Sequence, residues 1–274
     1  MAGSPELTPD KATGYDDLAA AWDALAAASA FSVRRVARHE SEPLLLAESA
    51  WTSRKPCVSL SAGVHGDEPA APWALLSIAR DGLLDERFAY RIWCCTNPAG
   101  YRRRTRENGG GIDINRSFSR DGRSAGTPEA ATIERANEGV RFALSLDLHE
   151  DHEALGFYCY EPVVEGSAPL GGGVVQAMLD AGLPVQELRA DFDLGYPDDA
   201  AHMRALERGR VMPDVAAEVA YFDGLPYSMY LLWTGTAHRT MTLEAPRARP
   251  WDERVAVLRV AVVAALTRLV QGRT

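Results

Sequence analysis

The apolar positions of the chain follow two patterns. Short apolar runs bounded by Gly, Pro or polar residues are typical of strands, and they cover residues 31–38, 44–50, 55–63, 88–96, 143–148, 156–160 and 239–243. Apolar positions three or four residues apart predict amphipathic helices, and they occur in residues 15–30, 69–80, 171–181 and 251–270. A further helix is expected to begin at Thr127. The first two strands are close enough in sequence to form a hairpin.

Strands and helices alternate along the chain, and no internal repeat or linker separates them. This order predicts an α/β fold with a single domain over residues 14–274, built on a central mixed, twisted β-sheet flanked by helices. Residues 1–13 show no apolar pattern and are expected to form a flexible N-terminus. Residues 189–235 are poorly periodic and are expected to be helix and loop.

One segment between the predicted elements is unusually long. Residues 97–126 are rich in Gly and Arg and show little periodicity. A loop of this length inside a compact domain is usually functional. The cluster Arg102, Arg103, Arg104 and Arg106 in this loop is either a solvated surface or a rim that attracts a substrate carboxylate.

Composition narrows the class of partner. The chain has 274 residues, of which 46% are hydrophobic and 24% charged, as in an ordinary globular protein. Its net charge of -9 disfavours nucleic acid as a partner. The apolar runs are too short to span a membrane, and the N-terminus shows no signal peptide. The four cysteines lie in apolar runs without a C-x-x-C pair, which indicates buried thiols in a reducing cytoplasm.

Two predicted strand ends carry residues that can bind a metal ion. In SAGVHGDEPA, an apolar run stops at a turn that contains His65 and Glu68, and in FALSLDLHED a second run is followed by His149. Zinc accepts imidazole nitrogen and carboxylate oxygen, and a catalytic zinc has three protein ligands and an open position. Open α/β sheets bind ligands at strand ends, so we expect these residues to hold one Zn²⁺ per chain. His152 is an alternative to His149 that fits the strand end less well.

Two further segments extend this pattern. NPAGYRRRTRENGGGIDINRSF spans residues 97–118, and TMTLEAP spans residues 240–246. In this order, the four segments resemble the zinc carboxypeptidase family, the metallocarboxypeptidases that share a fold with aspartoacylase and succinylglutamate desuccinylase. The resemblance covers residues 56–247 and implies a zinc carboxypeptidase-like, phosphorylase/hydrolase-like fold.

The resemblance implies roles for the residues around the metal. His65, Glu68 and His149 match the zinc ligands of the family. Glu244 matches its general base, which takes a proton from the attacking water and passes it to the leaving amine. Asp113 matches the carboxylate that hydrogen-bonds the outer nitrogen of the first ligand histidine, which orients the ring.

In the family, the middle segment supplies the substrate-binding groups. Arg106 matches the residue that polarises the scissile carbonyl and stabilises the oxyanion. R-R-T-R can also be aligned with the family pattern so that Arg103 takes this position. Asn115 and Arg116 match the residues that hold a terminal carboxylate, which a guanidinium binds in a two-pronged fork. Arg106 is thus an expected catalytic residue, and the other three are expected to bind substrate.

The sequence departs from the family pattern at a few positions. The spacing from Glu68 to His149 is shorter than in the digestive carboxypeptidases, and the usual N-R-N-F reads N-R-S-F here. Both departures leave the chemistry intact. Tyr221, Tyr227 and Tyr230 all fit the tyrosine that closes over substrate in some members, and we place Tyr230 among the expected substrate-binding residues.

These residues indicate a zinc metallopeptidase or amidohydrolase of the metallocarboxypeptidase type. It would cleave an amide bond next to a free carboxylate, in a peptide C-terminus or a peptidoglycan-derived peptide. The alternative is an N-acyl-amino-acid amidohydrolase of the aspartoacylase/succinylglutamate desuccinylase type, with the same pocket and metal. An inactive binding module on this scaffold is disfavoured by the retained ligands, base and arginines. The expected partner is a small peptide or N-acyl amino acid, not nucleic acid or a membrane.

Overall fold

Nine strands in the described part of the chain pair into one mixed sheet, in the order β1-β2-β4-β3-β5-β9-β6-β8-β7. The computed structural model describes residues 14–50, 55–188, 192 and 202–272, so the expected flexible N-terminus, residues 1–13, lies outside the described residues. The strands are β1 (Ser32–His39), β2 (Glu42–Glu48), β3 (Cys57–Ala62), β4 (Ala89–Trp93), β5 (Phe142–Asp151), β6 (Tyr158–Tyr160), β7 (Met203–Glu207), β8 (Arg210–Pro213) and β9 (Thr240–Pro246).

The centre of the sheet is parallel. β4, β3, β5 and β9 run in one direction, and antiparallel partners join them through β2 on one side and β6 on the other. β3 and β5 are buried along nearly their whole length, as expected for parallel strands covered on both faces. β9 is the last strand in the sequence, yet it lies between β5 and β6.

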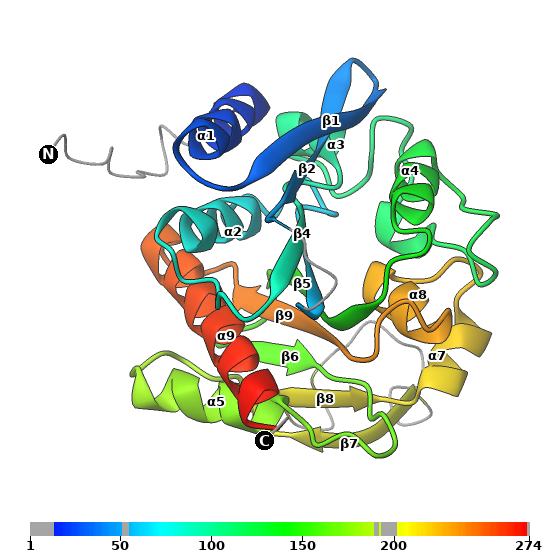
Figure 1. The fold of residues 1–274 in the computed structure, drawn as a ribbon. Helices are drawn as coiled ribbons and strands as arrows, with labels where there is room; N and C mark the ends of the chain where they lie inside the picture. Colours follow the sequence, from blue (N-terminus) through cyan, green and yellow to red (C-terminus); the bar gives the residue numbers. More distant parts are fainter. Residues whose placement is uncertain (1–13, 51–54, 189–191, 193–201, 273–274) are drawn as a thin grey trace, which may run out of the picture.

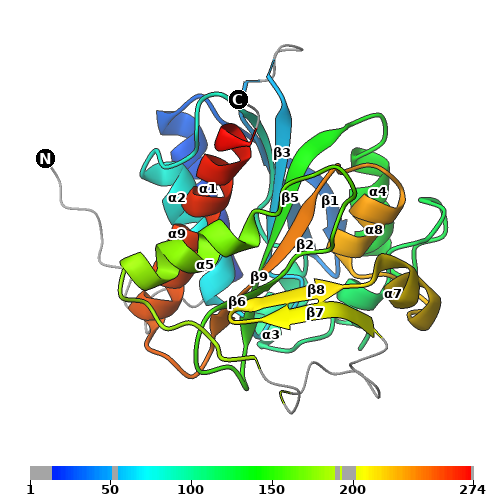
Figure 2. The same ribbon diagram turned by 90° about the horizontal axis from the view of Figure 1, so that it is seen from below.

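Helices cover both faces of the sheet (Figures 1 and 2). One layer contains α1 (Tyr15–Ala28), α2 (Ala70–Arg80), α5 (Gly171–Asp180) and α9 (Trp251–Gln271). The opposite layer contains α4 (Pro128–Ala136), α7 (Val215–Tyr221) and α8 (Tyr227–Trp233). The larger apolar core lies under the first layer, with Trp22, Leu75 and Val262 fully buried, and a second core lies under the other.

The predicted α/β class with a central mixed sheet flanked by helices is confirmed. The predicted hairpin is also confirmed, since β1 and β2 pair antiparallel. All four cysteines are buried and form no disulfide. No helix within the described ranges is both long enough and apolar enough to cross a membrane.

Two expectations about irregular segments were wrong. Residues 189–235 contain β7 and β8 as well as helices; these strands have five and four residues, too few to show a period. The Gly- and Arg-rich loop contains α3 (Pro98–Arg103) and a 3₁₀ turn at Ile114–Arg116. α3 is capped by Asn97, whose side chain accepts a hydrogen bond from Gly100, and Pro98 occupies its first turn, as is common at helix starts.

The turn after β3 requires glycine at two positions. Gly63 has a φ of +68°, and a Cβ there would lie 2.8 Å from the Cys95 sulfur. A Cβ on Gly66 would lie 1.9 Å from the backbone carbon of Gly100. This turn therefore packs directly against α3, and the contact fixes the side chains on either side of Gly66.

Candidate active site and metal centre

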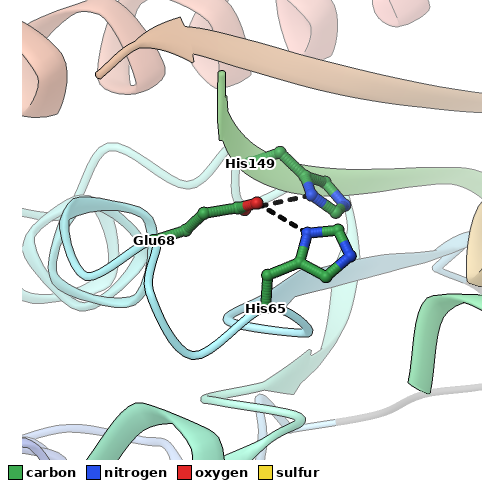
Figure 3. A group of neighbouring side chains, drawn as sticks. All are labelled: His65, Glu68 and His149. Atoms are coloured by element: carbon green, nitrogen blue, oxygen red, sulfur yellow. Dashed lines mark hydrogen bonds and ion pairs between the residues drawn. The ribbon is translucent and has the colours of Figure 1, made fainter. Parts of the chain in front are cut away.

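Three buried donor groups converge at the carboxyl ends of β3 and β5 (Figure 3). Glu68 places Oε1 2.6 Å from Nδ1 of His65 and Oε2 3.1 Å from Nδ1 of His149. The three ligand atoms lie within 4.8 Å of one another. His65 and Glu68 come from the turn after β3, whereas His149 belongs to β5, and the parallel pairing of these strands brings them together. The structure thus assembles the three predicted ligands in one place.

A carboxylate lies behind each ligand histidine. Nε2 of His65 is 3.4 Å from Asp113, and Nε2 of His149 is 3.1 Å from Asp147. Asp147 also accepts a 2.6 Å hydrogen bond from the hydroxyl of Ser61. Because an Nε2 proton given to a carboxylate leaves the Nδ1 lone pair available, both rings can offer Nδ1 to a metal.

The sequence prediction included Asp113 but missed Asp147. The signal was available, because Asp147 lies two residues before His149 in S-L-D-L-H. Residues two apart on a strand point to the same face, so an acid at this spacing is placed to reach the imidazole.

The charges of the ligand cluster depend on one another. Burial alone would lower the pKa of both histidines, but Glu68 raises it, with help from Asp113 for His65 and from Asp147 for His149. Burial would raise the pKa of Glu68, but the two rings hold it below its usual value. Glu68 therefore stays ionised, as an anionic metal ligand must.

Glu244 lies beside the ligand cluster on the next strand. In the parallel pairing of β5 with β9, Glu244 is directly opposite His149, so the two side chains share a face of the sheet. Burial, reinforced by Glu68 and opposed by His149, raises the pKa of Glu244 to about 8. Its carboxyl group is therefore a stronger base than an exposed one.

Arg106 reaches the same cluster from the loop after α3. Its Nη1 is 3.3 Å from Nδ1 of His65, and its Nε and Nη2 donate hydrogen bonds to Asp113. Asp113 thus contacts both the histidine and the arginine. The structure places a guanidinium next to the metal-ligand cluster, as the predicted role of Arg106 requires.

Asn115 and Arg116 lie on the 3₁₀ turn and face the same cavity. The side-chain oxygen of Asn115 accepts a 2.9 Å hydrogen bond from the backbone of Tyr227, which ties the turn to the start of α8. The guanidinium of Arg116 lies 4.4 Å from the ring centre of Phe222 and donates to the carbonyl of Asn115. The exposed side chain of Arg116 is positioned by the ring while retaining donors for an anion.

These groups surround a cavity of about 400 Å³. Other lining residues come from the turn after β3, from the ends of β5 and β9 and the residues just after them, and from β6, β8, α7 and α8; they include Asp67, Asp151, His152, Tyr158, Tyr160, Glu218, Ser228, Thr242 and Arg247. His152 is exposed at the rim and pairs with Glu153 rather than with the ligand cluster.

Two predicted substrate-binding residues do not line the cavity. Arg103 is exposed on α3 and forms a 2.7 Å ion pair with Glu40. Tyr230 is buried in the second apolar core, where its ring stacks 5.5 Å from Phe118. Arg103 is the last residue of α3, whereas Arg106 lies beyond the C-cap, Arg104, and lines the cavity.

The residues present suit a single divalent cation. Two nitrogens and one carboxylate oxygen approach from buried positions, and an acid behind each ring fixes its orientation. This donor set is typical of hydrolytic zinc. A metal held by His65, Glu68 and His149 would lie beside Glu244 and Arg106 and at the wall of the cavity.

The comparisons with known proteins agree with this arrangement. Residues 54–186 match the family model of the succinylglutamate desuccinylase/aspartoacylase catalytic domain. This segment contains the three ligands and the 3₁₀ turn, but ends before Glu244. No curated protein shows significant similarity to the chain.

Solved structures share the fold over nearly the whole chain. A protein provisionally described as a metallopeptidase from Shewanella amazonensis SB2B has a TM-score of 0.75 at 21% identity, covering 94% of each chain. A metallo-carboxypeptidase from Burkholderia cenocepacia has 0.69 at 17%, covering 94% of this chain and 70% of its own. Carboxypeptidase A from Helicoverpa armigera has 0.66 at 17%, with coverage of 93% and 73%.

At these identities the solved structures establish the fold, and the family model adds the segment that carries the ligands. The fold, the matched segment and the predicted motifs agree. The chain therefore has the fold of the metallocarboxypeptidases, and its residues 54–186 match the succinylglutamate desuccinylase/aspartoacylase catalytic domain, in agreement with the resemblance that its sequence motifs carry.

Proposed function

We propose that this protein is a zinc-dependent hydrolase that cleaves an amide bond next to a free carboxylate, as a metallocarboxypeptidase does. The observation that carries the proposal is the cavity itself. A buried His–Glu–His donor set, a carboxylate of raised pKa and two arginines all line it. Amide hydrolysis needs these groups together, namely a Lewis acid, a base, and cations that orient an anionic substrate.

A zinc ion at His65, Glu68 and His149 would supply Lewis acidity and lower the pKa of a water molecule. The other steps belong to the chain's own side chains. Glu244 takes a proton from the attacking water and delivers it to the leaving nitrogen. Arg106 donates hydrogen bonds to the carbonyl oxygen as negative charge develops there.

Arg116 and Asn115 hold the substrate carboxylate in this proposal. The guanidinium of Arg116 offers a planar pair of donors, and Asn115 keeps the turn in place through its bond to Tyr227. A carboxylate held there is near the ligand cluster, because the same cavity wall contains His65 and Arg106. The bond cleaved is therefore the amide adjacent to the carboxylate.

An N-acyl-amino-acid amidohydrolase is the second candidate. The match of residues 54–186 to the succinylglutamate desuccinylase/aspartoacylase catalytic domain favours it. Both reactions use the same metal, base and carboxylate clamp. They differ in the acyl side of the substrate, which is a peptide in one and a small acyl group in the other.

The test is a turnover panel on zinc-loaded protein. It contains benzoylglycyl dipeptides with a free C-terminus, the same compounds as C-terminal amides, and N-acetyl amino acids. We expect the free acid to be strongly preferred over its amide, and Arg116→Ala to lose most of that preference. One charge-assisted hydrogen bond contributes about 1.5–3 kcal/mol, so the loss should be roughly 10- to 100-fold.

Arg103→Ala is the matched control, since it removes an arginine that pairs with Glu40 outside the cavity. It should keep the wild-type preference. Turnover of N-acetyl amino acids alone selects the second candidate. Equal rates on acid and amide contradict the carboxylate clamp, and zinc binding without any turnover leaves only a binding module.

A further inference from the structure

The tyrosines that face the cavity are not the ones expected from the sequence. Tyr227 lies in the interior, where its hydroxyl contacts Ser59 and Asn137. Tyr221 lies outside the cavity lining, with its ring against His202. Within the described ranges, the tyrosines that line the cavity are Tyr158 and Tyr160 of β6.

The strand register places both tyrosines beside the base. Tyr158 is directly opposite Glu244, which is itself opposite His149, so these three form one row across β6, β9 and β5. Tyr160 is opposite Thr242, one row further along β9. Directly paired residues point to the same face of a sheet, so both phenols share the face of Glu244.

The two tyrosines have different surroundings. The hydroxyl of Tyr158 donates a 2.6 Å hydrogen bond to Asp151, and its ring is buried. Tyr160 packs edge-on against Tyr158, with 5.5 Å between the ring centres, and is less buried. Tyr158 is thus held by Asp151 and in turn supports Tyr160 at the cavity wall.

Two more hydroxyl groups line the cavity near Tyr160. Thr242, opposite Tyr160 on β9, donates a 3.1 Å hydrogen bond to the hydroxyl of Ser228 on α8. Ser228 directly follows Tyr227, whose backbone is bonded to Asn115. Tyr160, Thr242 and Ser228 therefore line the same cavity as Asn115 and Arg116, and Ser228 is next in the chain to a residue bonded to Asn115.

In the proposed reaction, the leaving group of the substrate would lie in this part of the cavity. Glu244 must deliver a proton to the leaving nitrogen, so that part of the substrate lies against Glu244. The sheet order β3-β5-β9-β6 puts Tyr160 on one side of Glu244, while Arg106, next to His65, is on the other. A leaving amino acid with its carboxylate on Arg116 would direct its side chain toward the three hydroxyls.

Resting on the proposed function, we propose that Tyr160, with Thr242 and Ser228, forms the subsite for the side chain of the leaving amino acid and selects a polar, hydrogen-bonding side chain. A site built to hydrogen-bond a substrate discriminates strongly against an apolar analogue, because its own polar groups then lose their partners. Glutamine and methionine form a suitable pair of probes, since they have similar size and differ in polarity.

The experiment compares benzoylglycyl-glutamine with benzoylglycyl-methionine, and N-acetylglutamine with N-acetylmethionine. The readouts are kcat/KM for zinc-loaded wild type and calorimetric affinity for the zinc-loaded Glu244→Gln variant, which reports binding without turnover. We expect wild type to favour glutamine by about tenfold or more. Tyr160→Phe removes only the hydroxyl and should reduce this ratio by about three- to tenfold, alone in the kinetic measurement and combined with Glu244→Gln in the calorimetric one.

Tyr230→Phe is the matched control, since that phenol is buried outside the cavity, and it should keep the wild-type ratio. The thermal midpoint and zinc content of Tyr160→Phe should also match wild type.

An unchanged glutamine-to-methionine ratio in Tyr160→Phe, or no preference in wild type, overturns the subsite even if amides are hydrolysed. Binding that depends on the Tyr160 hydroxyl, with no turnover of any substrate, supports the subsite and rejects the hydrolase proposal. Absence of binding to any probe overturns the subsite.

Discussion

At the scale of single residues, the position of Glu244 is the most informative feature of the site. It is buried on β9, with His149 of β5 directly opposite on one side and Tyr158 of β6 directly opposite on the other. It is not one of the three candidate metal donors. Burial raises its pKa to about 8, so its proton affinity suits exchange with a water molecule near neutral pH. In the proposed reaction, metal binding and proton transfer therefore fall to different side chains.

We predict that Glu244→Gln retains the metal and loses turnover. The amide is nearly isosteric with the acid but cannot accept a proton, and loss of a general base typically costs about 10²- to 10⁴-fold in rate. Metal content by elemental analysis and kcat on the best substrate of the panel are the measurements. Glu165→Gln, at an exposed position outside the cavity lining, serves as control. A kcat within tenfold of wild type would show that another group is the base.

At the scale of elements, the turn between β3 and α2 determines whether the ligands meet. His65 and Glu68 bracket Gly66, which packs directly on the backbone of α3 at Gly100. A side chain at Gly66 would push the turn away from α3. Because both ligands belong to this turn, such a shift would also move them away from His149.

We predict that Gly66→Ala lowers both stability and metal affinity. The new Cβ would lie 1.9 Å from a backbone carbon, which cannot move aside as a flexible side chain does, and overpacking of this kind costs about 1–3 kcal/mol. Urea unfolding and chelator competition for zinc measure the two effects. Gly172→Ala on α5 is the control, because its nearest contact would be an arginine nitrogen at 3.7 Å. Wild-type zinc affinity in Gly66→Ala would contradict the role of this turn.

The elements also show why part of the site was predictable. The end of β3 was located to within one residue, because its apolar run stops at the turn that contains His65. The apolar runs of β5 and β9 also identified these strands, but both strands continue three residues further, to Asp151 and Pro246, so that His149 and Glu244 lie within them. α3 was missed although Asn97 and Pro98 signal a helix start, because the Gly- and Arg-rich sequence after them reads as a loop. The places of Tyr158 and Tyr160 depend on β6 pairing antiparallel with β9, and a three-residue strand carries no sequence signal for its partner.

At the scale of the whole molecule, the layer of α9 is joined to the site by a buried ion pair. Arg254, near the start of α9, lies 3.1 Å from Glu150, which directly follows His149 and is fully buried. Glu150 also accepts a hydrogen bond from the backbone of Ala70 at the start of α2, and its own backbone donates to Glu68. One acid therefore links two helices of the same layer to the metal ligands.

We predict that Arg254→Ala destabilises the zinc-free protein by about 3–5 kcal/mol above pH 8, where Glu150 is ionised and would lose its cation, because burial raises the pKa of Glu150 to about 8. The free energy of unfolding in urea is the measurement, made without zinc so that metal loss does not contribute. Arg259→Ala on the same helix is the control, since it removes a partly exposed 2.7 Å pair with Asp81, which should contribute about 0–1 kcal/mol. Equal costs for the two variants would show that Glu150 does not depend on Arg254.

The central position of β9 has a consequence for how the protein is made. During synthesis, every strand from β1 to β8 leaves the ribosome before β9 does, so the growing chain has two exposed strand edges, on β5 and on β6, and lacks the acid that the chemistry needs. Unpaired edges of this kind are where nascent chains associate wrongly. If Glu244 is the base of the proposed reaction, the protein becomes active only after β9 has inserted between β5 and β6, and a fragment that stops before β9 has no activity.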